Sequence, residues 1–318
     1  MLNIKDACKS RDIRKVAQST PLLVPSFSSV VSEDISEIRN KLYEYINKTS
    51  LVSAYDLHYT HIDINDLWHS DLVFIDSGNY ETKKLDNSLS KKEWKCEYYI
   101  EILKQLQPMN KFVIVNYDEI EGIDVQIGRA RELFNTFPEH ASCFLCKPQP
   151  DTDGKVHVTP LIEKMDDIEQ FDILGLTEKE IGNSLLERCS NIVKLREALS
   201  RRTEIPIHIF GCLDPLSIIS YFLCGADIFD GTSWLKYTFV DNVAVYINNH
   251  ALLKKRWTDN DDRARAHSSV HNLGELINLE ARMNHYTQEY DLSLFQFQDT
   301  YLDQIKALTG AAGIYYGG

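Results

Sequence analysis

Residues 225–234, "GADIFDGTSW", place an aspartate at the end of an apolar run and follow it with glycine and small polar residues. Two interpretations fit such a strand end. Asp230 either caps the next segment, or it is a catalytic acid that a strand of an α/β protein delivers to the mouth of a pocket. The pattern in the rest of the chain helps to choose between them.

Five further runs are short, apolar and rich in Ile, Val and Phe, and most end in Asp, Gly or Pro. They are residues 71–78, 111–118, 141–148, 171–176 and 206–211. Segments with helical periodicity lie between them, at residues 91–108, 123–135, 178–201 and 214–224. This β–α alternation predicts a parallel sheet, either doubly wound or closed as an eight-stranded barrel.

Local signals predict where several of these segments begin. Thr177 and Glu180 form a capping-box pattern at the start of the helix over 178–201, and Asp214-Pro215 marks another helix start. Residues 81–95 are polar and predict a surface loop that runs into a helix. The small, Gly-rich segment 309–318 predicts a flexible tail.

The absence of a Gly-x-Gly-x-x-Gly or Walker loop weakens the doubly wound, nucleotide-binding alternative. Acids at the carboxyl ends of several strands favour the barrel, because active sites of such barrels collect at that end. We therefore predict an α/β fold, a TIM-like (β/α)8 barrel over residues 1–245. Residues 246–318 are expected to form a reduced helical extension packed on the barrel.

The formal net charge of −13 argues against broad electrostatic attraction to nucleic acid. No run approaches the length of a membrane span, and the N-terminal residues lack a signal-peptide core, so we expect no membrane partner and a cytoplasmic location. Seven scattered cysteines suit a reducing compartment. Cys143 and Cys146 have the spacing of half a zinc or redox site, but residues three apart on a strand point to opposite faces, which favours core thiols.

Asp76, Asp118 and Asp230 each end an apolar run. If their strands belong to one barrel, the three carboxylates converge on one mouth. Glycoside cleavage uses such a set: one carboxylate traps the sugar carbon while another transfers the proton. A third could accept hydrogen bonds from adjacent N–H groups of a base such as guanine.

Six motifs occur in the order found in the tRNA-guanine transglycosylase superfamily, and the chain resembles that family from about residue 19 to 234. They are "TPLLVPSF" (20–27), "FIDSGNYE" (74–81), "VNYDE" (115–119), "ILGLTEKEIG" (173–182), "HIFGCLDP" (208–215) and "GADIFDG" (225–231). The resemblance implies a TIM-like barrel that exchanges guanine in a polynucleotide for a 7-deazaguanine base.

By this resemblance Asp230 is the nucleophile that attacks C1′, Asp76 is the general acid/base, and Asp118 binds the N1 and N2 edge of guanine. Aromatic side chains at the positions of Tyr80 and Phe210 sandwich the base in the family, which suits a flat heterocycle. The alternatives are strand-end packing for Tyr80, a core position for Phe210, and a helix start at Thr232 and Ser233. The remaining base-binding candidates are Ser77, Gly175, Leu176, Lys147 and Gln149.

The chain departs from the family at several positions. Asn79 and Glu81 stand where the family has Gly and Gln, and Lys147 or Gln149 replaces the Gln-Gly-Gly that helps to hold the base. The three zinc cysteines are missing, because no cysteine follows Cys224. His271 resembles the zinc histidine, and with His267 it has the spacing of a two-residue chelate, but packing or capping is the favoured role, so we expect neither metal nor cofactor.

Three functions therefore stay open. The first is base exchange in a nucleic acid, tRNA or DNA, as in outlying branches that modify DNA with 7-deazaguanines. The second is a catalytically reduced binding or assembly protein that acts with partners in bacterial anti-phage defence. The third is an unrelated barrel hydrolase. The partners considered are guanine or a 7-deazaguanine, the nucleic acid acceptor, a second copy of the chain and a protein encoded in the same defence operon.

Overall fold

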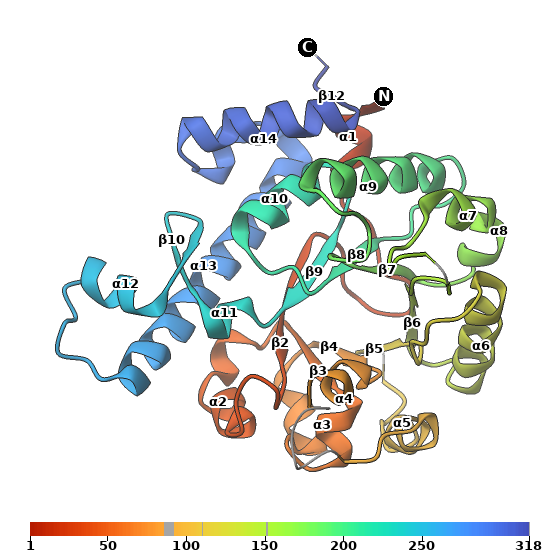
Figure 1. The fold of residues 1–318 in the computed structure, drawn as a ribbon, viewed down its shortest axis with the longest axis horizontal. Helices are drawn as coiled ribbons and strands as arrows, with labels where there is room; N and C mark the ends of the chain where they lie inside the picture. The colour runs from red at the N-terminus through yellow and green to blue at the C-terminus, as the bar shows by residue number, and fades with distance from the viewer. Residues whose placement is uncertain (86–91, 110, 151, 318) are drawn as a thin grey trace.

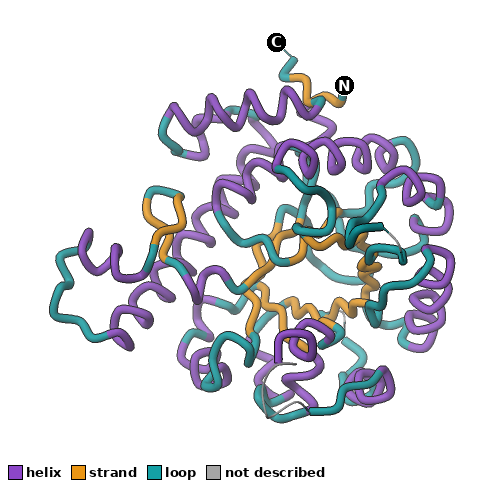
Figure 2. Tube along the Cα trace, viewed as in Figure 1, coloured by secondary structure: helices purple, strands orange, loops and turns teal. Residues whose placement is uncertain are grey.

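The computed structural model describes residues 1–85, 92–109, 111–150 and 152–317. Eight parallel strands form a closed barrel in chain order, and the last strand pairs with the first. Figures 1 and 2 show the strands as a ring surrounded by helices. The strands are β2 (Leu22–Phe27), β3 (Thr49–Ser53), β4 (Leu72–Asp76), β5 (Phe112–Val115), β6 (Ala141–Cys146), β7 (Ile173–Thr177), β8 (Ile207–Phe210) and β9 (Ile228–Gly231). The predicted α/β barrel is confirmed.

Most barrel strands are followed by short helices and turns that cover the outside. These are α2 (Ile35–Lys41), η1 (Tyr43–Tyr45), α3 (Ala54–His58), η2 (Ile64–His69), α4 (Asn79–Leu85), α5 (Cys96–Leu103), α6 (Ile123–Thr136), α7 (Val158–Glu163), α8 (Met165–Ile168), α9 (Leu185–Ser200), α10 (Pro215–Leu223) and α11 (Ser233–Lys236). Before the barrel come β1 (Leu2–Asn3) and α1 (Ile4–Ala7).

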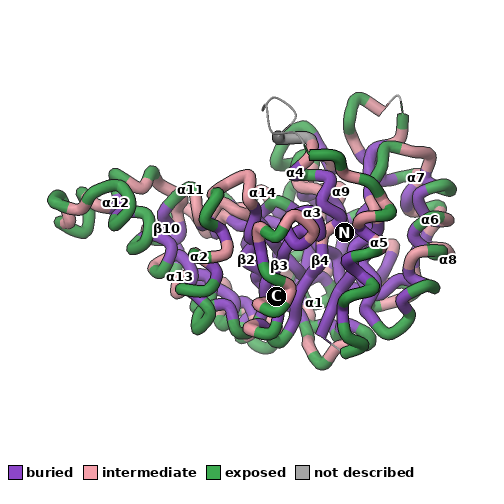
Figure 3. The backbone as a smooth tube through the Cα atoms, turned by 90° about the horizontal axis from the view of Figure 1, so that it is seen from below, coloured by how far each residue is buried: buried purple, intermediate pink, exposed green. Residues whose placement is uncertain are grey.

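Alternate residues of each strand enter two different apolar clusters, because successive side chains of a strand point to opposite faces. Leu22, Val24 and Phe74 fill the inside of the barrel, whereas Leu23 and Ile75 pack under the surrounding helices. Figure 3 accordingly shows strands such as β2, β3 and β4 mainly in the colour of buried residues. On β6, Cys143 belongs to the inner cluster and Cys146 to the outer one, and both thiols are free. The prediction of core thiols on opposite faces is confirmed.

The sequence patterns missed two of the barrel strands, β2 and β3, and the sequence of β3, "TSLVS", is short and half polar. Its polar side chains are buried because each finds a partner. Thr49 Oγ1 donates to the carbonyl of Leu23 at 2.9 Å, and Ser50 Oγ lies 2.8 Å from Ser70 Oγ. Ser53 ends the strand and caps α3 by accepting from the backbone N–H of Asp56.

Two predicted segment boundaries were wrong. Thr177 ends β7, and helix α9 begins eight residues later, at Leu185. Its N-cap Ser184 accepts through Oγ from the N–H of Glu187, and the Glu187 carboxylate accepts from the N–H of Asn183. This is a capping box in a second Ser/Thr-x-x-Glu pattern. The polar segment expected as a loop begins inside a helix, since α4 extends to Leu85, and its residues 86–91 lie outside the described residues. The start of α10 at Asp214-Pro215 is confirmed, with Asp214 accepting from the Ser217 N–H.

Residues after the barrel form β10 (Thr238–Val240), β11 (Val243–Val245), α12 (Ile247–Leu253), α13 (Asp261–Glu289), η3 (Leu292–Phe295), α14 (Asp299–Ala312) and β12 (Ile314–Tyr315). The hairpin of β10 and β11 with α12 stands out to one side of the barrel (Figures 1 and 3). Helix α14 packs on α9 and α10. The flexible tail predicted for residues 309–318 was wrong for its described part, because β12 pairs with β1 and Tyr316 Oη bonds to Thr309 Oγ1 at 2.5 Å.

A buried ion network closes the amino-terminal end of the barrel, at the residue just before β9. Asp227 Oδ1 accepts from Arg11 at 2.7 Å, and Asp227 Oδ2 accepts from Arg196 and from the N–H of Ile207. All three charged side chains are at most 2% exposed. Asp227 therefore joins the N-terminal segment, α9, β8 and β9.

We expect Asp227→Ala to lower the free energy of unfolding by about 3–5 kcal/mol, because it leaves two guanidinium groups buried without their counter-ion. Urea unfolding measured by circular dichroism gives this quantity. Glu204→Gln is the matched control: it removes a half-exposed partner of Arg11 and should cost less than about 1 kcal/mol. Equal losses in both variants would contradict the role given to Asp227.

Candidate active site at the carboxyl ends of the strands

Asp76 is the last residue of β4, Asp230 is the last but one of β9, and Asp118 follows β5. In a closed parallel barrel these carboxyl ends open on the same mouth. The charges of the three groups act on one another: the pKa of Asp76 is raised to about 7, first by burial and then by Asp118 and Asp230. A carboxyl group with a pKa near neutrality can both donate and accept a proton.

Asp230 is held from both neighbouring strands. Ser26 Oγ on β2 donates to Oδ2 at 2.7 Å, while His208 Nε2 on β8 and the backbone N–H of Gly211 lie 3.0 and 3.3 Å from Oδ1. The interpretation of Asp230 as a helix cap is wrong, because α11 begins after Thr232 without a side-chain capping bond. Thr232 and Ser233 do begin that helix, as the alternative reading expected.

Asp118 is 8% exposed and is surrounded by donors. Ser77 Oγ and the Asn79 side-chain amide both donate to Oδ1, the latter at 3.4 Å. Lys147 Nζ lies 3.8 Å from Oδ2 and is itself bound by both carboxylate oxygens of Glu180, at 2.8 and 2.7 Å. Thus Ser77, Asp118 and Lys147, three predicted site residues, form one contact network.

The loop after β4 is fixed by close packing at Gly78. Its φ is +89°, and a Cβ there would lie 2.8 Å from Tyr55 Cβ, so only glycine fits. Trp94 packs over the same glycine and donates its indole N–H to the carbonyl of Ser77 at 3.0 Å. These contacts hold Ser77 in place to bond with Asp118.

The other predicted base-binding residues do not all share this network. Phe210 is buried in the inner cluster and stacks on His208, whereas Tyr80 is 41% exposed at the start of α4. Gly175 faces the barrel interior, where a Cβ would lie 2.7 Å from Phe210 Cε2, and the Leu176 side chain belongs to the outer cluster. Gln149 accepts from the N–H of Ile123 at 3.2 Å and so bonds to the start of α6.

Among the described residues, no group of three or more His, Cys, Asp or Glu side chains is arranged to hold a metal ion. His271 Nε2 lies 2.7 Å from the carbonyl oxygen of Phe239, and its ring stacks on His250. His267 contacts Arg256. His271 therefore has the packing role favoured over the two-histidine chelate. None of the described helices is long and apolar enough to cross a membrane.

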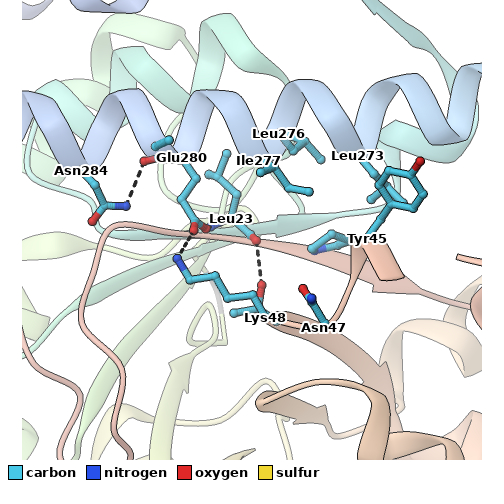
Figure 4. A pocket seen from close by; sticks show the side chains of 12 residues that line it. Leu23, Tyr45, Asn47, Lys48, Leu273, Leu276, Ile277, Glu280 and Asn284 are labelled. Carbon is cyan, nitrogen blue, oxygen red and sulfur yellow. Dashed lines mark hydrogen bonds and ion pairs between the residues drawn. The ribbon is translucent and has the colours of Figure 1, made fainter. Parts of the chain in front are cut away.

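A cavity of about 240 Å³ lies elsewhere, between α13 and the first residues of β2 and β3 (Figure 4). Glu280 reaches from α13 to Lys48 and accepts from the N–H of Leu23 at 2.6 Å. These contacts attach α13 to the barrel wall near the amino ends of the strands. The cavity is thus separate from the carboxylates at the mouth.

Sequence reasoning missed a second buried carboxyl pair beside Asp76. Glu81 accepts from Ser28 Oγ at 2.6 Å, and Asp56 accepts from the N–H of Ser29 at 3.0 Å. The other oxygens, Glu81 Oε2 and Asp56 Oδ1, are buried and have no hydrogen-bond partner among the described residues. The Gln-to-Glu departure at position 81 was the available signal.

The residues at the mouth and the closed parallel barrel define the class: a (β/α)8-barrel protein with an acidic site at the carboxyl ends of its strands. No family model matches the chain, and no curated protein is significantly similar to it. The assignment of a function therefore depends on the geometry of the site.

We expect Asp230→Asn to lower the pKa of Asp76 below about 7, because it removes one of the two negative charges that oppose ionisation of Asp76. Carboxyl ¹³C NMR across pH 3–9 measures the shift. Asp303→Asn, on the exposed surface of α14, is the control and should leave the pKa of Asp76 unchanged. If the pKa of Asp76 is the same in Asp230→Asn as in the parent protein, the charge of Asp230 does not act on Asp76.

Glu81 predicts a pH dependence of stability. Its pKa is raised well above the ordinary value, first by burial and then by Asp56 and Asp76. The folded state therefore binds more protons than the unfolded chain once pH exceeds about 4.5, so the free energy of unfolding falls as pH rises. Glu81→Gln, which cannot ionise, should make this fall shallower in urea titrations carried out above about pH 4.5, and the remaining fall is expected from Asp76. Glu101→Gln, an exposed change on α5, should leave it as steep as in the parent protein.

Proposed function

We propose that this protein is a base-exchange transglycosylase that replaces guanine, or a related base, by a 7-deazaguanine in a nucleic acid. The observation that carries the proposal is the convergence of Asp76, Asp118 and Asp230 on one mouth, with Asp76 poised near neutral pH. These are the carboxylates to which the sequence resemblance assigns proton transfer, base binding and nucleophilic attack.

In this proposal Asp230 attacks C1′ of the nucleoside, and the bond from C1′ to the departing base breaks. Asp76 gives its proton to the base as the bond breaks and takes one from the incoming base in the reverse sense. Ionised Asp230 is an acceptor of three hydrogen bonds, which orient its carboxylate. The glycosyl-aspartate ester is then opened by the second base, and the carboxylate is regenerated.

The pair Asp118 and Lys147 supports a base with a lactam edge. An ionised Asp118 can only accept hydrogen bonds, and the Lys147 ammonium can only donate them. Their polar atoms lie 3.8 Å apart, so together they complement an N–H beside a carbonyl, as at N1 and O6 of guanine. Adenine-like bases reverse this order of donor and acceptor, and they should be excluded.

One observation favours the alternative, a catalytically reduced binding or assembly protein acting with partners in anti-phage defence. Asp118 Oδ1 is already bonded to Ser77 and Asn79, and Lys147 is already paired with Glu180. A base must therefore compete with bonds within the protein. A binding measurement with a free base distinguishes the two functions, because only a working pocket would bind the base.

We expect guanine and 7-cyano-7-deazaguanine to bind the parent protein, and Asp118→Ala to weaken binding at least about 100-fold, since it removes two hydrogen bonds to a charged acceptor. Isothermal titration calorimetry measures this effect. 2,6-Diaminopurine, with an amino group in place of O6, should bind much more weakly because it cannot accept from Lys147.

Asp303→Ala is the matched control for folding and should bind guanine as the parent protein does. Absence of binding by the parent protein would contradict base exchange and favour the assembly alternative. Equal binding by the parent protein and Asp118→Ala would place the base elsewhere.

A further inference from the structure

His208 is a buried titratable residue described so far as one of three hydrogen-bond partners of Asp230. It is the second residue of β8, its side chain points into the barrel, and it is 0% exposed. Its Nε2 lies 3.0 Å from Asp230 Oδ1. The other ring nitrogen, Nδ1, is buried without a hydrogen-bond partner among the described residues.

Two aromatic rings fix the orientation of the imidazole. Phe210 stacks on it with ring centroids 3.8 Å apart and an interplanar angle of 27°. Phe74, across the barrel on β4, meets it edge-on at 5.3 Å and 71°. Close packing on both rings prevents rotation that would move Nε2 away from Asp230.

The unpartnered Nδ1 selects one tautomer. A proton on Nδ1 would be a buried donor without an acceptor, and Nε2 would then meet the carboxylate with its lone pair. A proton on Nε2 instead donates to Asp230 and leaves only an acceptor unsatisfied at Nδ1, which costs less. A doubly protonated ring would also carry a proton on Nδ1, and that proton would again be a buried donor without an acceptor.

We propose that His208, as the neutral Nε2–H tautomer, is a positioning residue that fixes Asp230 so that Oδ2 is the attacking oxygen. The inference rests on the proposed function for the identity of the reaction. Oδ1 receives two donors, His208 and Gly211, which occupy both of its lone-pair directions. Oδ2 receives one, from Ser26, and keeps one free.

The electron balance follows from this arrangement. A lone pair of Oδ2 forms the bond to C1′, and the electrons of the bond to the departing base leave with that base, which is protonated by Asp76. Oδ1 becomes the ester carbonyl. When the incoming base attacks C1′, the C1′–Oδ2 electrons return to the carboxylate, and the donors on Oδ1 stabilise the charge that reappears.

His208 does not act as an acid or base in this scheme. It has no exposed surface, and its free nitrogen faces the packed interior, so no substrate proton can reach it. This separates the site from a histidine–aspartate hydrolase, in which the imidazole itself removes a proton from the nucleophile.

Long-range ¹H–¹⁵N NMR of the histidine rings tests the arrangement without any substrate. Among the ten histidine rings, the one assigned to His208 by its loss in His208→Gln should carry a proton on Nε2 and none on Nδ1. In Asp230→Ala the Nε2 proton should lose its downfield shift. A His208 ring protonated at Nδ1, or charged, would overturn the proposal.

Exchange of tritiated guanine into total tRNA, and separately into denatured genomic DNA, tests the consequence. His208→Leu removes the donor and should lower kcat about 100-fold, with the KM for guanine within about twofold. His208→Gln keeps an N–H at similar reach and should recover activity to within about tenfold of the parent. Equal losses in folded Leu and Gln variants would overturn the positioning role.

Different results would contradict the exchange reaction and the positioning role of His208. If the parent protein exchanges guanine into neither polymer and binds no guanine, the proposed function is wrong, and the NMR result still decides whether His208 holds Asp230. If exchange occurs but His208 carries its proton on Nδ1, base exchange is supported and the positioning role of His208 is wrong.

Discussion

The pairing of β2 with β9 is the constraint on which the site depends. Leu22 to Pro25 lie in register with Ile228 to Gly231, and this closes the barrel. Closure brings Ser26 beside Asp230, although 204 positions separate them in the chain. An open sheet of the same strands would leave Asp230 with donors from one side only. The orientation of the carboxylate is therefore a property of the closed barrel and not of any local motif.

A second constraint is electrostatic. Carboxylates that share one mouth oppose one another's ionisation, and burial of a carboxyl group opposes its ionisation further. Ser26, His208 and Gly211 surround Asp230, and Ser77, Asn79 and Lys147 surround Asp118. Asp76 shifts toward neutrality instead. Burial, followed by the charges of Asp118 and Asp230, thus raises the pKa of Asp76 and lets this group transfer a proton near neutral pH.

The sequence predicted the barrel because apolar runs and helical periodicity alternate strongly, and it located the strand-end acids because each interrupts such a run. It could not predict β3, whose Thr and Ser are buried only through partners from Leu23 and Ser70. It also placed the start of α9 too early, because Thr177–Glu180 and Ser184–Glu187 fit the same capping pattern and only strand pairing of Thr177 with Phe210 excludes the first.

For the site, sequence order was sufficient to select Asp76, Asp118 and Asp230 but not their surroundings. The donors to Asp230 come from β2 and from β8 and the turn after it, which lie far apart in the chain. His208 was part of a quoted motif, yet its direction into the barrel depends on the register of β8 against β7 and β9. The bond from the backbone N–H of Ile123 to Gln149 likewise depends on the three-dimensional arrangement and had no signal in the sequence.

Trp94 gives the site a built-in optical reporter. Its indole packs over Gly78 and bonds to the carbonyl of Ser77, one residue from Asp76. Of the other three tryptophans, Trp68 and Trp257 are 46% and 72% exposed and Trp234 is buried beside Phe27. Displacement of the Ser77 loop by a bound base would change the emission of the partly buried Trp94, while the exposed indoles could be quenched selectively by iodide. Occupancy of the barrel mouth can thus be followed by intrinsic fluorescence, without a label on the protein or the ligand.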